Sequence, residues 1–203
     1  MRKLFLGMAL AAAAAAVNAG VVAQVTVTCG TPSGKWGHSW GLPTVNVTYS
    51  TGTDAGTPGL FWLGILTPDQ QFATALDLNG EWIQYEGGLY PPHKRYDGGL
   101  PGTVSISVPL PGGVTNTAPF VGHTLYAGHG AYTQQSAQMV NKRRTYLNTI
   151  KPERQAKGKW QSAYDDDTLF MWSLVQRDMT DKEKWGPVLT IPFIECTQDT
   201  GGG

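Results

Sequence analysis

Most of the chain after residue 24 consists of short apolar runs separated by turn residues, a pattern typical of many short β-strands. The clearest alternation lies at residues 103–108, where Val104, Ile106 and Val108 share one face and predict a half-buried strand. Residues 60–66 are continuously apolar, which predicts a central strand covered on both faces. The other segments predicted as strands are 25–29, 45–49, 72–78, 81–85, 123–127, 169–175 and 188–196. The segment 169–175 fits a helix as well.

One stretch breaks the strand pattern. Residues 133–149 contain no Gly or Pro, and apolar residues such as Ala137, Val140 and Leu147 recur at roughly helical spacing. We therefore predict one helix, which ends at Lys151-Pro152 because proline disrupts a helix interior.

Many short strands with one helix predict a mainly β fold, an antiparallel β-sandwich with one inserted helix. The sandwich domain is expected to cover residues 24–200, with a helical and basic insertion at about 133–160. The Gly-Gly-Gly end, residues 201–203, is expected to be a flexible tail.

The first 23 residues have the layout of a cleavable signal peptide. Arg2 and Lys3 precede an uncharged apolar run, and small residues follow at Ala19 and Ala23. The run is shorter than the roughly 20 apolar residues of a membrane anchor. We expect cleavage after Ala23, no membrane span afterwards, and a protein exported through the periplasm that is secreted or held at the cell surface.

The chain has two cysteines, Cys29 and Cys196. In an exported protein, two cysteines predict one disulfide, and two free thiols are the alternative. Both lie in strand-like runs near the ends of the mature chain. The bridge would therefore hold the first and last strands together.

Several Trp, Tyr and Gly residues resemble a motif set of secreted and cell-surface bacterial proteins. The runs are Asn79-Gly80-Glu81-Trp82, Tyr85 to Gly88, Leu100-Pro101-Gly102, and Leu125 to Gly130. Such domains are immunoglobulin-like β-sandwiches, and the similarity covers about residues 43–132. It implies a surface or structural module and no catalytic residue. Residues 133–187 depart from the pattern.

Composition narrows the function classes further. The chain has 15 basic and 15 acidic side chains, so its formal net charge is zero, which argues against a nucleic-acid binder. With 41% hydrophobic residues the chain can build a core, which argues against global disorder.

None of the candidate catalytic or metal-binding patterns has the sequence context that its chemistry requires. Residues 37–41 match G-x-S-x-G around Ser39, but no strand–turn–helix context surrounds them. Asp165-Asp166-Asp167 lacks the alternating spacing of a calcium loop, so a solvated acidic loop is the simpler interpretation. The four histidines, expected to be structural or exposed, lack the usual zinc spacing and stand at His38, His93, His123 and His129. We predict no metal, no cofactor and no enzyme.

The strongest local feature is a basic stretch. Residues 142–159 carry seven basic side chains against Glu153 alone, a net charge of +6. Such a segment suits an acidic polysaccharide, lipid headgroups or an acidic protein face, whereas a solvated helix face balanced by Asp165 to Asp167 is the plain alternative. Together with tryptophans in polar surroundings, the candidate binding residues are Trp36, Trp40, Lys142, Arg143, Arg144, Arg154 and Trp160.

Three hypotheses follow. The first is an exported, non-enzymatic β-sandwich protein that acts as a structural or adhesive component of a bacterial surface or envelope assembly, through a protein partner or self-assembly. The second is a carbohydrate- or ligand-binding module that uses exposed Trp and the basic segment. The third is an envelope hydrolase that uses Ser39 or a pair of acidic residues.

Overall fold

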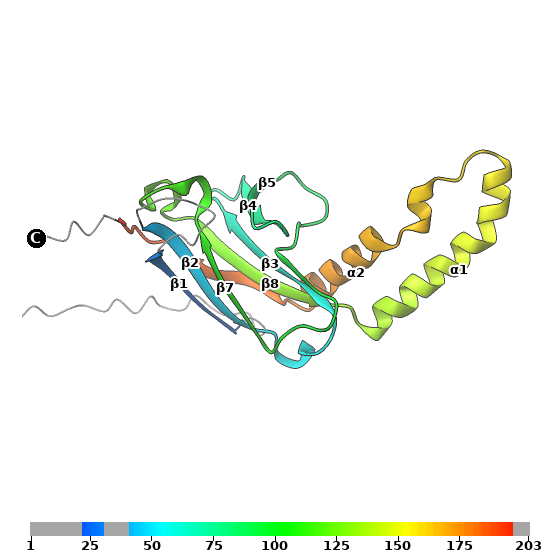
Figure 1. The fold of residues 1–203 in the computed structure, drawn as a ribbon, viewed down its shortest axis with the longest axis horizontal. Coiled ribbons are helices and arrows are strands. Elements are labelled where there is room, and N and C mark those ends of the chain that lie inside the picture. The colour runs from blue at the N-terminus through cyan, green and yellow to red at the C-terminus, as the bar shows by residue number, and fades with distance from the viewer. Residues whose placement is uncertain (1–21, 31–40, 197–203) are drawn as a thin grey trace, which may run out of the picture.

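The computed structural model describes residues 22–30 and 41–196 and contains two antiparallel β-sheets and two α-helices (Figure 1). The predicted signal peptide up to residue 21, Trp36, Ser39, Trp40 and the predicted tail lie outside the described residues. The three-stranded sheet has the order β1-β2-β7, with bounds Val22–Gly30, Leu42–Ser50 and Thr103–Pro109. The six-stranded sheet has the order β5-β4-β3-β8-β9, and β6 pairs with β3. Its strands are β3 (Gly59–Leu66), β4 (Ala73–Leu76), β5 (Trp82–Tyr85), β6 (Lys94–Tyr96), β8 (Thr124–Ala131) and β9 (Trp185–Thr190).

The mainly antiparallel β prediction is confirmed. In β7 the even-numbered residues 104, 106 and 108 are buried and the residues between them are exposed, as the alternation predicts. β3 is buried along nearly its whole length and pairs with β4, β6 and β8, as expected for a central strand.

The main core lies between the two sheets. Val45, Val47 and Tyr49 of β2 face Phe61, Leu63 and Ile65 of β3, and Tyr49 and Phe61 meet edge to face at 5.1 Å between ring centroids. Burial of this apolar surface is the main free-energy gain that holds the two sheets together.

The prediction of a single helix that ends before Pro152 is wrong. The first helix, α1 (Gln134–Ala156), continues through Pro152, and the second, α2 (Thr168–Asp181), occupies the segment predicted as a strand at 169–175. Pro152 and Asn148 are both exposed, so water can satisfy the Asn148 carbonyl that Pro152 leaves without a donor. In α2 the buried positions follow helical spacing and are Leu174, Val175, Asp178 and Met179. Because Asp178 is polar, the sequence does not show these four positions as a continuous apolar face of a helix.

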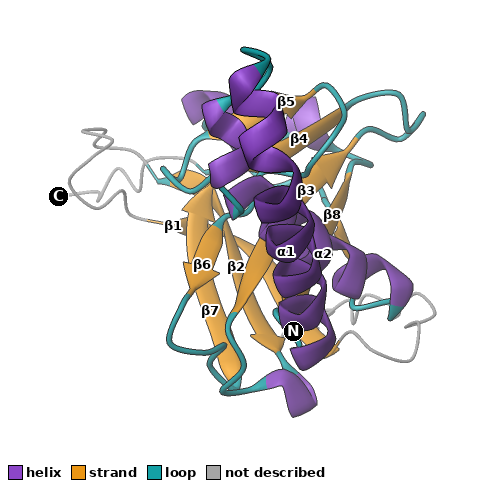
Figure 2. Ribbon diagram, turned by 90° about the vertical axis from the view of Figure 1, so that its right-hand side faces the viewer, coloured by secondary structure: helices purple, strands orange, loops and turns teal. Residues whose placement is uncertain are grey.

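The two helices form a hairpin between β8 and β9. α2 packs Val175 and Met179 on Leu60 and Trp62, which lie on the face of β3 away from the main core. α1 extends away from the sheets along the long axis of the molecule, and both helices lie in front of the strands in the perpendicular view (Figures 1 and 2). Within residues 22–30 and 41–196, no helix is long and apolar enough to cross a membrane.

Glycine in β8 makes the close approach of α2 possible. A Cβ on Gly130 would lie 2.1 Å from the carbonyl oxygen of Val175, and a Cβ on Gly128 would lie 2.8 Å from that of Lys184. Any larger residue would therefore push α2 or the start of β9 off the sheet.

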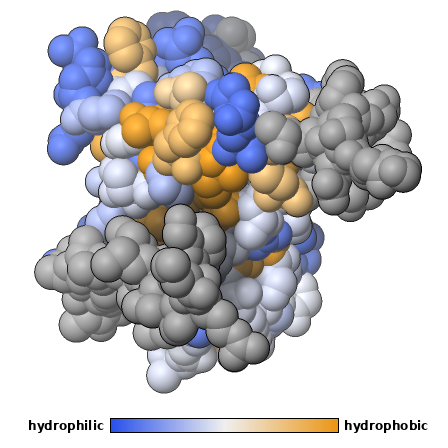
Figure 3. All heavy atoms as spheres, turned by 90° about the vertical axis from the view of Figure 1, so that its left-hand side faces the viewer, coloured by the Kyte–Doolittle hydropathy of each residue, from blue (hydrophilic) through white to orange (hydrophobic). Residues whose placement is uncertain are grey.

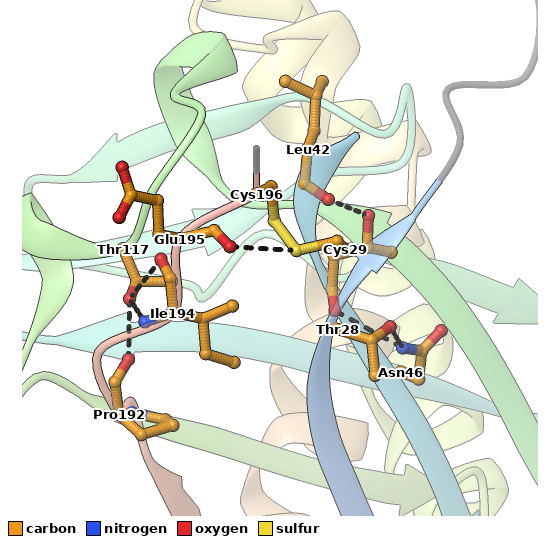
Figure 4. Close-up of a disulfide and its surroundings, with 10 residues drawn as sticks. Thr28, Cys29, Leu42, Asn46, Thr117, Pro192, Ile194, Glu195 and Cys196 are labelled. Atoms are coloured by element: carbon orange, nitrogen blue, oxygen red, sulfur yellow. Dashed lines mark hydrogen bonds between the residues drawn. A yellow bond between two sulfur atoms is a disulfide. The ribbon is translucent and has the colours of Figure 1, made fainter. Parts of the chain in front are cut away.

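Cys29 and Cys196 form a disulfide, with their Cα atoms 5.4 Å apart (Figure 4). The bridge joins the end of β1 to the segment that follows β9. Thr117 anchors the same segment, because its Oγ1 donates to the carbonyl of Pro192 and accepts from the amide of Ile194.

Candidate functional site: the projecting helical arm

We call residues 134–167, which comprise α1 and the segment leading into α2, the arm. Thr133 caps the start of α1, because its side chain accepts a hydrogen bond from the amide of Ser136 at 3.2 Å. At 1.5 Å per residue the 23-residue helix is about 34 Å long. Only Ser136 and Val140 of α1 are buried, and Tyr146 is 63% exposed. Most of this helix therefore has no packing role within the described chain.

Two of the predicted binding residues hold the arm to the start of α2. Arg143 and Arg144 each pair with one carboxylate oxygen of Asp167, which is buried. The Arg143 guanidinium also lies 5.4 Å from the ring centroid of Phe170. These contacts make Asp167 the anchor between the two helices.

A third predicted residue, Trp160, packs inside the arm. Its indole Nε1 donates to Asp165 at 3.1 Å, and Lys151 donates to the same carboxylate at 2.6 Å. The Lys151 ammonium lies 5.1 Å from the Trp160 ring centroid. The hydrogen bond from Lys151, followed by that from Trp160, holds the pKa of Asp165 below its ordinary value.

The acidic run 165–167 thus pairs with cations of the arm, and Asp166 accepts from the amide of Thr168 at 2.8 Å. In the part of the chain that the structure describes, no three His, Cys, Asp or Glu side chains gather in a way that would hold a metal ion.

Three exposed basic residues of the arm form no ion pair with another described residue. Among the described residues, no ion pair involves Lys142, Arg154 or Lys159, whereas Lys157 pairs with Glu153. Arg154 and Lys159 belong to residues 153–160, which we call the arm tip. The arm tip thus carries two of these three exposed cations, and Lys142 lies nearer the start of α1.

A buried polar network lies at the root of the helical hairpin. The His129 imidazole places Nε2 2.8 Å from Oδ2 of Asp54 and Nδ1 2.9 Å from the hydroxyl of Tyr49. Lys184 donates to Asp54 at 2.5 Å and to Asp178 of α2 at 2.6 Å. The amide of Ala131 donates to Asp178 at 2.8 Å, so the network joins β8, α2 and the segment before β9.

Burial and charge work against each other in this network. Burial lowers the pKa of His129, although the bond to Asp54 acts to raise it. Burial acts to raise the pKa of Asp178, but Lys182 and Lys184 hold it below its ordinary value. Burial also raises the pKa of Tyr49.

The order Asp54–His129–Tyr49 resembles a relay for activating a hydroxyl. Tyr49, however, is 0% exposed and its ring packs between the two sheets, so a substrate has no access to the hydroxyl. The arrangement fits the role of fixing the hairpin to the sandwich. The sequence pattern offered one signal for it, the glycines on both sides of His129.

A second candidate site is an aromatic groove on the outer face of the six-stranded sheet. A cavity of about 130 Å³ is lined by Gly64 of β3 and by aromatic side chains from four segments. Tyr85 stacks on Tyr90 at 4.2 Å, and Tyr126 stacks on Trp185 at 5.3 Å. The predicted Trp36 and Trp40 lie outside the described residues, and none of the other candidate binding residues predicted from the sequence lines this groove.

The end of the sandwich opposite the arm carries a third surface. Figure 3 shows apolar side chains gathered on part of that end. Val121 and Phe193 are exposed apolar residues in loops of the chain.

Comparisons of the chain with protein-family models, curated proteins and solved structures found no match. The function must therefore be inferred from the geometry of the chain itself.

Proposed function

We propose that the chain is an exported, non-enzymatic β-sandwich protein that serves as a structural or adhesive component of a surface or envelope assembly. The observation that carries this proposal is the arm, a 23-residue helix whose side chains are almost all outside the body of the molecule. Ordering a long exposed helix costs conformational entropy that its few intramolecular contacts offset only weakly. Binding a protein partner supplies the missing contacts.

The order of the strands supports an immunoglobulin-like arrangement as part of the proposal. In the lettering of that fold, β1-β2-β7 corresponds to A-B-E, and β5-β4-β3-β8-β9 corresponds to C″-C′-C-F-G. The helical hairpin then occupies the connection between F and G, one of the loops with which such sandwiches commonly bind partners.

Export belongs to the same proposal. The Cys29–Cys196 bridge suits an oxidising compartment. Strand β1 already pairs at Val22 with Ser50 and at Ala23 with Tyr49. Leader cleavage after Ala19 leaves this strand whole, whereas cleavage after Ala23 shortens it by two residues.

Photo-cross-linking from the arm tests the proposed function. A photoreactive amino acid replaces Tyr146 in cells that export the protein, and the matched control places it at Ser105, an exposed residue of β7 far from the arm. We expect a discrete protein adduct from position 146 that is absent from position 105. No adduct from either position, or equal adducts from both, would contradict a docking role for the arm.

The aromatic groove favours a second function, a carbohydrate- or ligand-binding module. Rings such as those of Trp185 and Tyr126 offer faces for stacking on sugars, and the exposed cations of the arm suit an acidic polysaccharide. Titration with a panel of polysaccharides, followed by tryptophan fluorescence, tests it. A saturable change that is lost in Tyr90→Ala supports ligand binding, and a flat response across the panel contradicts it.

A further inference from the structure

Two stretches of the chain each carry an excess of charge of one sign. Residues 41–93 contain five acidic side chains and no Lys or Arg, whereas residues 142–159 carry a net charge of +6. The acidic side chains concentrate around one structure, the hairpin of β4 and β5. We call residues 69–86 the acidic hairpin; its four charged side chains are Asp69, Asp77, Glu81 and Glu86.

The acidic hairpin lies at the edge of the six-stranded sheet. β5 is the last strand in the sheet order and pairs with β4 alone, so its outer edge has no neighbour within the described chain. Glu81 and Glu86 stand immediately before and after this strand and are exposed. Neither forms an ion pair with another described residue. Asp77, by contrast, accepts hydrogen bonds from the backbone amides of Asn79 and Glu81 in its own turn.

Apolar side chains are exposed beside these acids. Phe72 is 56% exposed, Leu78 53% and Ile83 38%. A surface that combines exposed apolar residues with unpaired charge of one sign is suited to a protein partner of the opposite sign. The acids also repel another acidic strand from the free edge of β5.

The arm tip offers the complementary chemistry. Arg154 and Lys159 are exposed and form no ion pair with any described residue. Tyr146, which precedes the tip in α1, adds an exposed aromatic ring. α1 leads the tip away from β4 and β5 of the same copy along the long axis of the molecule (Figure 1). The tip is therefore placed to meet the acidic hairpin of another molecule and not its own.

We infer that the partner of the arm is a second copy of this chain, and that the arm tip of one copy docks on the acidic hairpin of the next. This inference rests on the proposed function and names its partner. Because the two surfaces differ, each docked pair retains one free arm tip and one free acidic hairpin. Such a head-to-tail contact adds copies in a row or closes into a ring.

Paired charge reversals test the inference by sedimentation velocity over a range of concentrations. The wild type is expected to self-associate, and to do so less as the salt concentration rises from about 0.05 M to about 0.5 M. Arg154→Glu with Lys159→Glu reverses the arm tip, and Glu81→Lys with Glu86→Lys reverses the acidic hairpin. Each double variant is expected to weaken self-association at least about tenfold.

Mixing the two double variants gives the sharpest result. Each retains one intact surface, and the two reversed surfaces are complementary in charge, so an equimolar mixture should self-associate again, with the two variants alternating. Combining all four substitutions in one chain should restore self-association. The control matched to the arm-tip variant, Lys94→Glu with Arg177→Glu, makes the same change of net charge as that variant at exposed positions outside both surfaces and should behave as wild type. Circular dichroism checks that each variant is folded.

A wild type that stays monomeric, double variants that associate as wild type does, or a mixture of the two double variants that does not associate would each overturn the inference. Its failure is distinguishable from that of the proposed function. If the chain is monomeric but position 146 still cross-links to a different protein, the arm binds another partner and only the inference fails. If neither self-association nor an arm adduct is found, both fail.

Discussion

The Nε2 atom of His129 lies 2.8 Å from the Asp54 carboxylate, in a buried site that joins the helical hairpin to the sandwich. In the neutral imidazole the Asp54 carboxylate keeps the proton on Nε2, so Nδ1 and the carbonyl oxygen of Lys184, each 2.9 Å from the Tyr49 hydroxyl, compete for its single proton. This relationship makes the attachment of the hairpin sensitive to pH.

Stability is predicted to fall as the pH drops below 6.5, the ordinary pKa of histidine. Burial lowers the pKa of folded His129, so the unfolded chain binds a proton more readily than the folded chain. The contribution of His129 to the free energy of unfolding is fully present above the ordinary pKa of histidine. It is lost progressively as the pH falls toward the lowered pKa of His129 in the folded state. His93, whose pKa burial also lowers, acts in the same direction.

Urea unfolding of His129→Gln and His93→Gln between pH 5 and pH 8 separates the two contributions. His129→Gln should cost about 1–3 kcal/mol at pH 7.5 and should flatten the pH dependence. A wild-type stability that does not change over this range would contradict the prediction.

Gly130→Ala should be strongly destabilising. The added Cβ would lie 2.1 Å from the backbone carbonyl of Val175, so α2 must shift off the sheet. We expect a loss of about 2–4 kcal/mol in the free energy of unfolding. Gly98→Ala is the control, because a Cβ there meets nothing within 4 Å. Equal stabilities of the two variants would show that α2 does not pack against β8 in this way.

Removal of the disulfide should weaken the whole sandwich. Cys29 and Cys196 are 167 residues apart in sequence, and a bridge across so long a loop is worth about 2–5 kcal/mol. Cys29→Ser with Cys196→Ser should lower the urea midpoint to that of the reduced wild type, and reductant should have no further effect on the variant. An oxidised wild type whose midpoint is unmoved by reductant would contradict this prediction.

Asp167→Asn should loosen the arm without unfolding the sheets. Arg143 and Arg144 both pair with this buried carboxylate, so its neutralisation weakens the main polar contact between α1 and α2. Hydrogen exchange of α1 amides should accelerate about tenfold or more, whereas β3 and β8 amides stay protected. Asp166→Asn, at an exposed position next to it, is the control. Unchanged exchange in α1 would show that Asp167 does not hold the arm.

The sequence pattern predicts the strands of the sandwich better than it predicts the two helices of the helical hairpin. A strand with one face in a core, such as β7, must alternate, so residues 103–108 are sufficient to predict it. The apolar face of α2 includes Asp178, whose burial depends in part on the amide of Ala131, 47 residues earlier in the chain, and is invisible to a local pattern. For the same reason the pattern at 169–175 fits a strand as well as a helix.

The candidate site depends even more on contacts between distant residues. The +6 net charge of residues 142–159 distinguishes this segment in the sequence, but it does not show which cations are free of ion pairs. Arg143 and Arg144 share the carboxylate of Asp167, which lies 24 and 23 residues further along the chain, whereas Arg154 and Lys159 form no ion pair with a described residue. The aromatic groove likewise gathers side chains from segments more than 100 residues apart, from Gly64 to Trp185.

Proximity between the arm tip of one copy and β5 of another is the most direct test of the account. Both natural cysteines are in the disulfide, so one introduced cysteine per chain gives a single reactive thiol. Gln155→Cys labels the arm tip and Gln84→Cys labels β5, both at exposed, uncharged positions. With a short bismaleimide, a mixture of the two variants should yield a covalent dimer in higher amount than a mixture of Gln155→Cys with Ser105→Cys. Equal yields from the two mixtures, or no dimer at all, would contradict the docking of arm tip on acidic hairpin.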